Sequence, residues 1–196
     1  MSSADKALKL LREGNRRFVA GEMIHPYQTV QRRNEVAKGQ QPFAIIFGCA
    51  DSRVPPEFIF DRGLGDLLVI RTAGHTLDRA SLNSVEFGVH ELRIPLVMVL
   101  GHQNCAAVTS TIEVVEKGAK LHGAHAVLVK TIRPAVHKMR SEPGDLLDNA
   151  VRANVELTVG RLRASKILTT FLKKGKARIV GARYDLSSGK VNVIFP

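Results

Sequence analysis

The chain has 196 residues, of which 44% are hydrophobic and 24% are charged, and its formal net charge is +11 at pH 7. This length allows one domain with a substantial core, and the composition excludes a disordered chain. No apolar run approaches the ~20 residues of a transmembrane helix, which excludes a membrane span. The N-terminus lacks the apolar segment of a secretory signal, so we expect a cytoplasmic protein whose two cysteines stay reduced.

Apolar periodicity predicts helices that alternate with strands. In chain order, helices are expected over 3–18 and 26–38, from Pro55-Pro56 as a short segment, and over 78–91, 106–116, 124–139 and 145–172. Strands are expected over 43–48, 66–71, 96–100, 178–184 and 191–195. The helix over 124–139 should break at Pro134, because proline disrupts a helix interior. The last strand follows a turn at 187–190 and should form an antiparallel edge.

The alternation predicts one α/β domain over residues 1–196. We expect a central, mostly parallel four-stranded sheet plus a C-terminal edge strand, flanked by helices. Residues 1–38 would form an N-terminal helical arm and residues 39–196 the α/β core. In such sheets ligands bind at the carboxyl ends of the strands, and Cys49, Arg71 and His102 all stand there in three different strands.

The positive charge gathers late in the chain. Between Leu157 and Tyr184 there are eight Lys and Arg residues and no Asp or Glu. Such a stripe could attract a polyanion, but the chain has no Trp and only two Tyr, and no basic segment is interleaved with aromatic residues that stack on bases. We interpret the stripe as a solvated helix face and expect no nucleic-acid partner.

The only two cysteines stand in the segments Cys49-Ala50-Asp51-Ser52-Arg53 and Gly101-His102-Gln103-Asn104-Cys105. Two thiolates and an imidazole form a zinc ligand set that leaves a fourth position for water or a carboxylate. His102 and Cys105 should lie on one face of the opening turn of the helix over 106–116. A disulfide between the cysteines is the alternative, which a reducing compartment disfavours.

Asp51 and Arg53 follow Cys49 at steps of two residues. In an extended chain the three side chains would face one way. Arg53 is then expected to hold Asp51 ionised and oriented through a paired hydrogen-bond fork. Taken alone, Asp51 could equally be a turn or cap residue, but beside Cys49 and Arg53 a catalytic role is favoured.

Three motifs carry a resemblance to a known family. Cys-x-Asp-x-Arg at 49–53, Arg-Thr-Ala-Gly at 71–74 and Gly-His-x-x-Cys at 101–105 resemble the β-class carbonic anhydrases, in the same order and on the same elements. The resemblance covers nearly the whole chain. It implies an enzyme with one Zn²⁺ per chain that interconverts CO₂ and bicarbonate, assembled as a homodimer or homotetramer.

The resemblance also implies roles for single residues. Cys49, His102 and Cys105 would bind the zinc ion, which lowers the pKa of a bound water to around 7 and supplies the hydroxide that attacks CO₂. Asp51 would accept a hydrogen bond from that hydroxide while Arg53 orients it. In a closed, inactive state of the family, Asp51 would become the fourth zinc ligand.

Four further positions match the substrate site of the family. Gln40 matches a glutamine that donates to bicarbonate across the dimer interface, although it could also be an ordinary loop residue. Leu68 and Ala73 fall where the family lines an apolar pocket for CO₂, although both could be core residues. Ala106 departs from the glycine of many relatives, whose backbone amide meets the substrate, and its methyl group can crowd the pocket.

Other interpretations remain open at this stage. The same scaffold could act on a CO₂ analogue such as CS₂ or COS, for which Ala106 and the pocket lining are the only hints. A non-catalytic zinc protein that binds an acidic partner would need a closed four-ligand site. The remaining histidines are interpreted as surface or packing residues, one of which could relay protons: His25, His75, His90, His122, His125 and His137.

Overall fold

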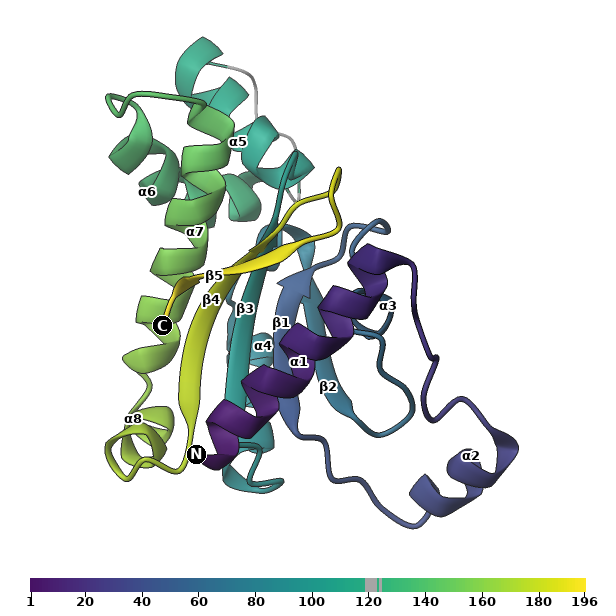
Figure 1. Ribbon diagram of the computed structural model, residues 1–196. Coiled ribbons are helices and arrows are strands. Elements are labelled where there is room, and N and C mark those ends of the chain that lie inside the picture. Colours follow the sequence, from purple (N-terminus) through teal and green to yellow (C-terminus); the bar gives the residue numbers. More distant parts are fainter. Residues whose placement is uncertain (119–122, 124) are drawn as a thin grey trace.

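A five-stranded sheet of order β2-β1-β3-β4-β5 forms the centre of the protein (Figure 1). This computed structural model describes residues 1–118, 123 and 125–196. The strands are β1 Ala44–Cys49, β2 Leu67–Thr72, β3 Leu96–His102, β4 Arg178–Tyr184 and β5 Val191–Phe195. The first four strands are parallel to one another and β5 is antiparallel to β4, which confirms the mostly parallel sheet with a C-terminal edge strand.

Helices cover both faces of this sheet (Figure 1). They are α1 Ser3–Ala20, α2 Val30–Val36, α3 Pro56–Ile59, α4 Arg79–His90, α5 Ala106–Lys117, α6 His125–Met139, α7 Leu146–Arg163 and α8 Lys166–Lys173, with a 3₁₀ turn η1 at Ala73–His75. Side-chain caps set several of their starts, since Ser2 and Asp78 form capping boxes ahead of α1 and α4. None of the helices in the described ranges is both long enough and apolar enough to cross a bilayer.

Alternate residues of each central strand belong to two separate core clusters, one on each face of the sheet. On one face, Ile46 of β1 packs with α1 and α3. On the other face, Ile45 and Phe47 pack with α4, α7 and α8. Because both faces of β1 are covered, its six residues are all buried, which explains the continuous apolar run in its sequence.

Two sequence predictions about helices prove wrong. The helix expected over 145–172 is two helices, because Ser165 adopts an extended conformation and its side chain caps α8 by accepting a hydrogen bond from the Leu168 N–H. Conversely, α6 continues through Pro134 without a break. The residues around it, Ile132, Ala135 and Val136, are buried, so packing offsets the backbone hydrogen bond that proline cannot make.

The second helix is shorter than its sequence pattern predicts. It was expected over 26–38 but α2 covers only Val30–Val36, with Thr29 as its N-cap. Tyr27 has a φ of 56°, which is incompatible with a helix, so the segment ahead of Thr29 forms a turn instead.

A buried ion pair ties the end of α1 to the chain after α3. The carboxylate of Asp61 pairs with the Arg17 guanidinium and also accepts the backbone N–H groups of Ile24 and His25, at 3.2 and 2.9 Å. Burial raises the pKa of Asp61, but the hydrogen bonds from Arg17 and the two amides lower it by more. The pKa of Asp61 therefore lies below its usual value. Asp61 therefore stabilises the fold in its ionised form.

This arrangement predicts a pH-dependent loss of stability. The contribution of Asp61 is present above its unfolded pKa and is lost as the pH falls through its lower folded pKa. Asp61→Asn should lower the free energy of unfolding at pH 7 by about 1–3 kcal/mol. The deficit should shrink in acid, as urea denaturation between pH 7 and pH 3 will measure. Glu13→Gln, which breaks an exposed ion pair with Lys9 on α1, should cost less; an equal cost would contradict the role of burial.

Candidate metal centre

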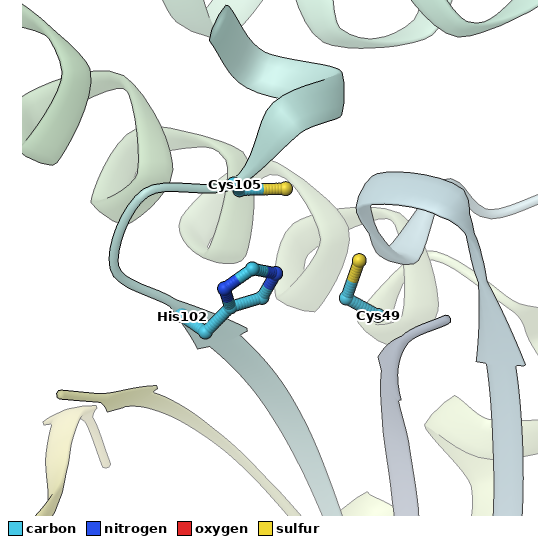
Figure 2. A group of neighbouring side chains, drawn as sticks. All are labelled: Cys49, His102 and Cys105. Carbon is cyan, nitrogen blue, oxygen red and sulfur yellow. The ribbon is translucent and has the colours of Figure 1, made fainter. Parts of the chain in front are cut away.

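Three side chains that can bind a metal converge at the carboxyl edge of the sheet (Figure 2). Cys49 is the last residue of β1, His102 is the last residue of β3, and Cys105 directly precedes α5. Because β1 and β3 are parallel neighbours, their carboxyl ends meet. One ligand atom from each residue lies within 4.8 Å of the other two, and all three residues are buried.

His102 presents one ring nitrogen to this group and uses the other to hold its orientation. Its Nδ1 lies 2.8 Å from the carbonyl oxygen of Gln103, which can only accept, so Nδ1 carries the proton. Its Nε2 is buried and has no hydrogen-bond partner in the described part of the chain. A buried nitrogen lone pair without a donor is unfavourable unless a cation occupies the space in front of it.

The two thiols face the same space. The neighbouring Cys105 thiol lowers the pKa of Cys49 strongly, and although burial raises it, His102 and the Gly74 N–H, which donates to Sγ at 3.3 Å, lower it further. The nearby Cys49 sulfur and burial raise the pKa of Cys105. Both cysteines are free, so the alternative of a disulfide is not what the structure contains.

Zinc fits this donor set. Ligand atoms around a tetrahedral zinc ion, at 2.0–2.3 Å from the metal, are about 3.3–3.8 Å apart. The observed separations, all within 4.8 Å, need only small side-chain rotations to reach that geometry. Two thiolates and one imidazole nitrogen match the ligand preference of Zn²⁺ and leave one coordination position open.

The local backbone around these ligands differs from the sequence prediction in two places. His102 belongs to the end of β3 and not to the opening turn of α5, so His102 and Cys105 meet across a short loop. After Cys49 the chain is not extended: Asp51 accepts the Arg53 N–H at 2.9 Å and starts a turn. The side chains of Asp51 and Arg53 nevertheless meet, because the turn brings residues i and i+2 together.

Asp51 and Arg53 form the paired fork that the sequence predicts. Arg53 Nε lies 2.9 Å from Asp51 Oδ1, and Arg53 Nη2 lies 2.7 Å from Oδ2. These hydrogen bonds lower the pKa of Asp51 to about 2, so the carboxylate is ionised at neutral pH. Its Oδ2 is 3.8 Å from Nε2 of His102, which places a hydrogen-bond acceptor beside the open corner of the metal centre.

Arg71 has a role that sequence reasoning left open. Its Nε donates to the Cys49 carbonyl at 2.9 Å and its Nη2 donates to the Asp51 carbonyl at 2.6 Å. The guanidinium therefore fixes the backbone on both sides of Ala50, between a metal ligand and the acid. The signal for this role was its position at the end of β2, the strand beside β1.

Two of the four predicted substrate residues share one cavity. Ala73 and Ala106 line a hollow of about 230 Å³ together with Ala107, Ser110, Leu128 and Val129. Each adjoins the metal centre, since Gly74 follows Ala73 and Ala106 follows Cys105. Leu68 instead packs against the core cluster under α4, in register with Ile45 near the amino end of β2 and away from the carboxyl ends of the strands. Its substrate role stays a prediction.

Gln40 is not brought to the metal centre within one chain. It is an exposed residue in the loop between α2 and β1. The amino end of a six-residue strand is about 15–20 Å from its carboxyl end, and Cys49 is the last residue of β1. A contact between Gln40 and a metal centre therefore requires a second chain.

The other histidines divide by exposure. His25, His90 and His137 are exposed, as expected of surface residues, and His122 lies outside the described residues. His75 is buried, and burial lowers its pKa to about 4, so its ring is neutral at pH 7. Its Nε2 lies 2.9 Å from Nδ2 of Asn154, a buried residue of α7 that sequence analysis did not single out.

Comparison with known proteins identifies the family. Residues 44–191 match the carbonic anhydrase family. A carbonic anhydrase of Mycolicibacterium smegmatis is 40% identical over 188 residues, which are 95% of this chain and 91% of the relative. Carbonic anhydrase 2 of Mycobacterium tuberculosis is 43% identical over 185 residues, which are 94% of this chain and 89% of the relative.

Solved structures agree with this fold. A tetrameric β-carbonic anhydrase from Sordaria macrospora superimposes with a TM-score of 0.78 at 20% identity, over 89% of this chain and 90% of that chain. The β-carbonic anhydrase of Coccomyxa, in complex with acetazolamide, gives 0.73 at 23% identity, over 99% and 87%. The chain therefore belongs to the β-class carbonic anhydrase family, whose reaction is the reversible hydration of CO₂ and whose metal is zinc.

The metal centre predicts a clear difference between two histidine variants. His102→Gln should lower the zinc content of purified protein from about one ion per chain to near zero, because a three-ligand site loses its only nitrogen donor. His90→Gln, at an exposed residue of α4, should keep the full content. Metal analysis by mass spectrometry after dialysis measures both, and stoichiometric zinc in the first variant would refute the ligand assignment.

Proposed function

We propose that this chain hydrates CO₂ reversibly at a zinc ion held by Cys49, His102 and Cys105. Asp51 orients the nucleophile, and Arg53 holds Asp51 in place. The observation that carries the proposal is that Nε2 of His102, which has no hydrogen-bond partner among the described residues, faces two thiols in a buried space. When bound, zinc supplies a hydroxide nucleophile at neutral pH. The rest of the catalytic arrangement comes from the side chains around it.

Asp51 supplies orientation at the reacting atoms. Its Oδ2 stands 3.8 Å from the His102 nitrogen that faces the metal, so it can accept a hydrogen bond from a group at the open corner. A carboxylate with a pKa of about 2 accepts hydrogen bonds and does not donate them at neutral pH. It therefore selects a nucleophile that points its proton toward Asp51 and its lone pair toward the substrate.

Arg53 keeps Asp51 in this role. Both carboxylate oxygens are engaged by the fork, so the side chain is directed at Arg53 and is not a metal ligand in this arrangement. The guanidinium also donates to the Asn104 carbonyl at 3.3 Å, which links it to the loop between His102 and Cys105. A purely structural zinc site needs a fourth protein ligand and does not require an ion pair such as Asp51–Arg53 beside the metal. The pair therefore favours catalysis over the non-catalytic alternative.

The cavity beside the ligands suits a small apolar substrate. Five of its six lining residues have aliphatic side chains: Ala73, Ala106, Ala107, Leu128 and Val129. We assign CO₂ to this side of the metal centre. Assays with CO₂, COS and CS₂ in parallel distinguish the proposed substrate from its sulfur analogues.

The active unit that we propose is a homodimer or a homotetramer in a reducing compartment such as the cytoplasm. Free thiols are needed to bind the metal, which suits such a compartment. Gln40 stands at the far end of β1 from the ligands of its own chain, so its proposed hydrogen bond to bicarbonate must reach the metal centre of a partner subunit.

A variant of Arg53 tests orientation separately from charge. Arg53→Lys keeps a positive charge but cannot form the fork, so kcat/KM for CO₂ hydration should fall about 10- to 100-fold at unchanged zinc content. Asp51 stays ionised at neutral pH even at an ordinary carboxyl pKa, so the loss should be equal at pH 7 and pH 9. Stopped-flow measurement at both pH values checks this; an unchanged rate would exclude the orienting role.

Mixed dimers test the role of Gln40. Gln40→Ala and Cys49→Ser should each be weakly active alone. After unfolding and joint refolding, half of the dimers contain both chains and each of these has one complete site, so about a quarter of the wild-type activity should return. Gln41→Ala serves as the matched control and should be fully active alone. No recovery in the mixture would show that Gln40 does not act across the interface.

A further inference from the structure

The turn between β2 and α4 directs a backbone amide at the metal centre. Gly74 and His75 in this turn have φ values of 60° and 43°, and the Gly74 N–H donates to the Cys49 sulfur at 3.3 Å. Glycine adopts the left-handed conformation readily, whereas histidine does so at a cost. Contacts from outside the turn must therefore stabilise His75 in this conformation.

Asn154 of α7 supplies these contacts. Its side chain is buried, and its Nδ2 lies 3.0 Å from the Gly74 carbonyl oxygen and 2.9 Å from Nε2 of His75. An amide nitrogen carries two hydrogens, so Asn154 can donate to both acceptors at once. One side chain thus holds the backbone of the first left-handed residue and the ring of the second.

The turn held in this way touches both strands that carry ligands. On β1, it reaches the sulfur of Cys49 through the Gly74 amide. On β3, the His75 ring packs against Gly101, the residue before His102: a Cβ built on Gly101 would lie 3.5 Å from Cε1 of the ring. There is little space for the turn to move, because a Cβ on Gly74 would lie 2.9 Å from side-chain atoms of both Ala107 and Ile132.

We propose that Asn154 is a positioning residue of the metal centre, which holds the Gly74–His75 turn so that the Gly74 N–H stays directed at the Cys49 sulfur. The inference rests on the proposed function of this site as a zinc centre. A hydrogen bond to a ligating atom fixes the orientation of the ligand and withdraws electron density from it. Loss of such outer contacts typically lowers metal affinity or activity about 10- to 100-fold.

Two variants of Asn154 and one control test the proposal. Asn154→Leu removes both donors at similar volume, and Asn154→Ala removes them without adding bulk, in case leucine does not fit. Val159→Ala is the control, because it shortens a buried side chain of the same helix that packs in the core cluster under α4 and α8. Zinc affinity is measured by competition with a chelator, and the Co²⁺-loaded proteins are compared by absorption spectroscopy.

Both Asn154 variants should bind zinc at least about 10-fold more weakly than wild type. Their sulfur-to-cobalt charge-transfer band should move to longer wavelength, because a thiolate that loses a hydrogen bond holds its electrons less tightly. Val159→Ala should lose stability but keep the affinity and the band. Wild-type affinity and an unshifted band in a folded Asn154 variant would overturn the inference and leave the proposed function intact. A wild-type protein that binds no zinc would overturn both.

Discussion

The structure depends on the burial of Cys49, His102 and Cys105 side by side, which is unfavourable without a cation and favourable with one. Two thiols and an imidazole nitrogen lie within 4.8 Å of one another in a buried corner, and Nε2 of His102 has no donor there in the described part of the chain. Burying such groups unpaired costs free energy. A divalent cation with two thiolates and a neutral imidazole satisfies all three, and the net charge of that group is zero, which suits a buried position.

The surroundings of the ligands serve to hold this corner in place. Arg71 fixes the backbone on both sides of Ala50, and the Gly74 amide contacts the Cys49 sulfur. The ion pair of Asp51 with Arg53 adds no net charge, so an acceptor can stand next to the metal without drawing the cation out of its thiolate ligands. Binding of the metal and the proposed orientation of the nucleophile therefore involve separate groups of side chains.

Much of the fold could be predicted from the sequence because the signals were local or periodic. The apolar runs that become β1 and β3 indicated strands buried on both faces, and their ends placed Cys49 and His102 at one edge of a parallel sheet. The prediction of helix boundaries failed where tertiary contacts determine them. Pro134 lies inside α6 because its neighbours are buried between helices, and Ser165 divides a continuous apolar pattern because its side chain can cap α8 and contact Glu86 at 2.6 Å.

The sequence by itself determined the ligand set, the ion pair beside it and the family, because these follow from residue types at short spacings. It also determined the alternation of helices and strands, since burial on one or two faces leaves a period in the chain. Only the tertiary structure decided the order of the strands, the turn that joins Asp51 to Arg53, and the contacts of Arg71 and Asn154 with segments 20 to 80 residues away. Contacts over such separations leave no local pattern, because they depend on how the whole chain packs.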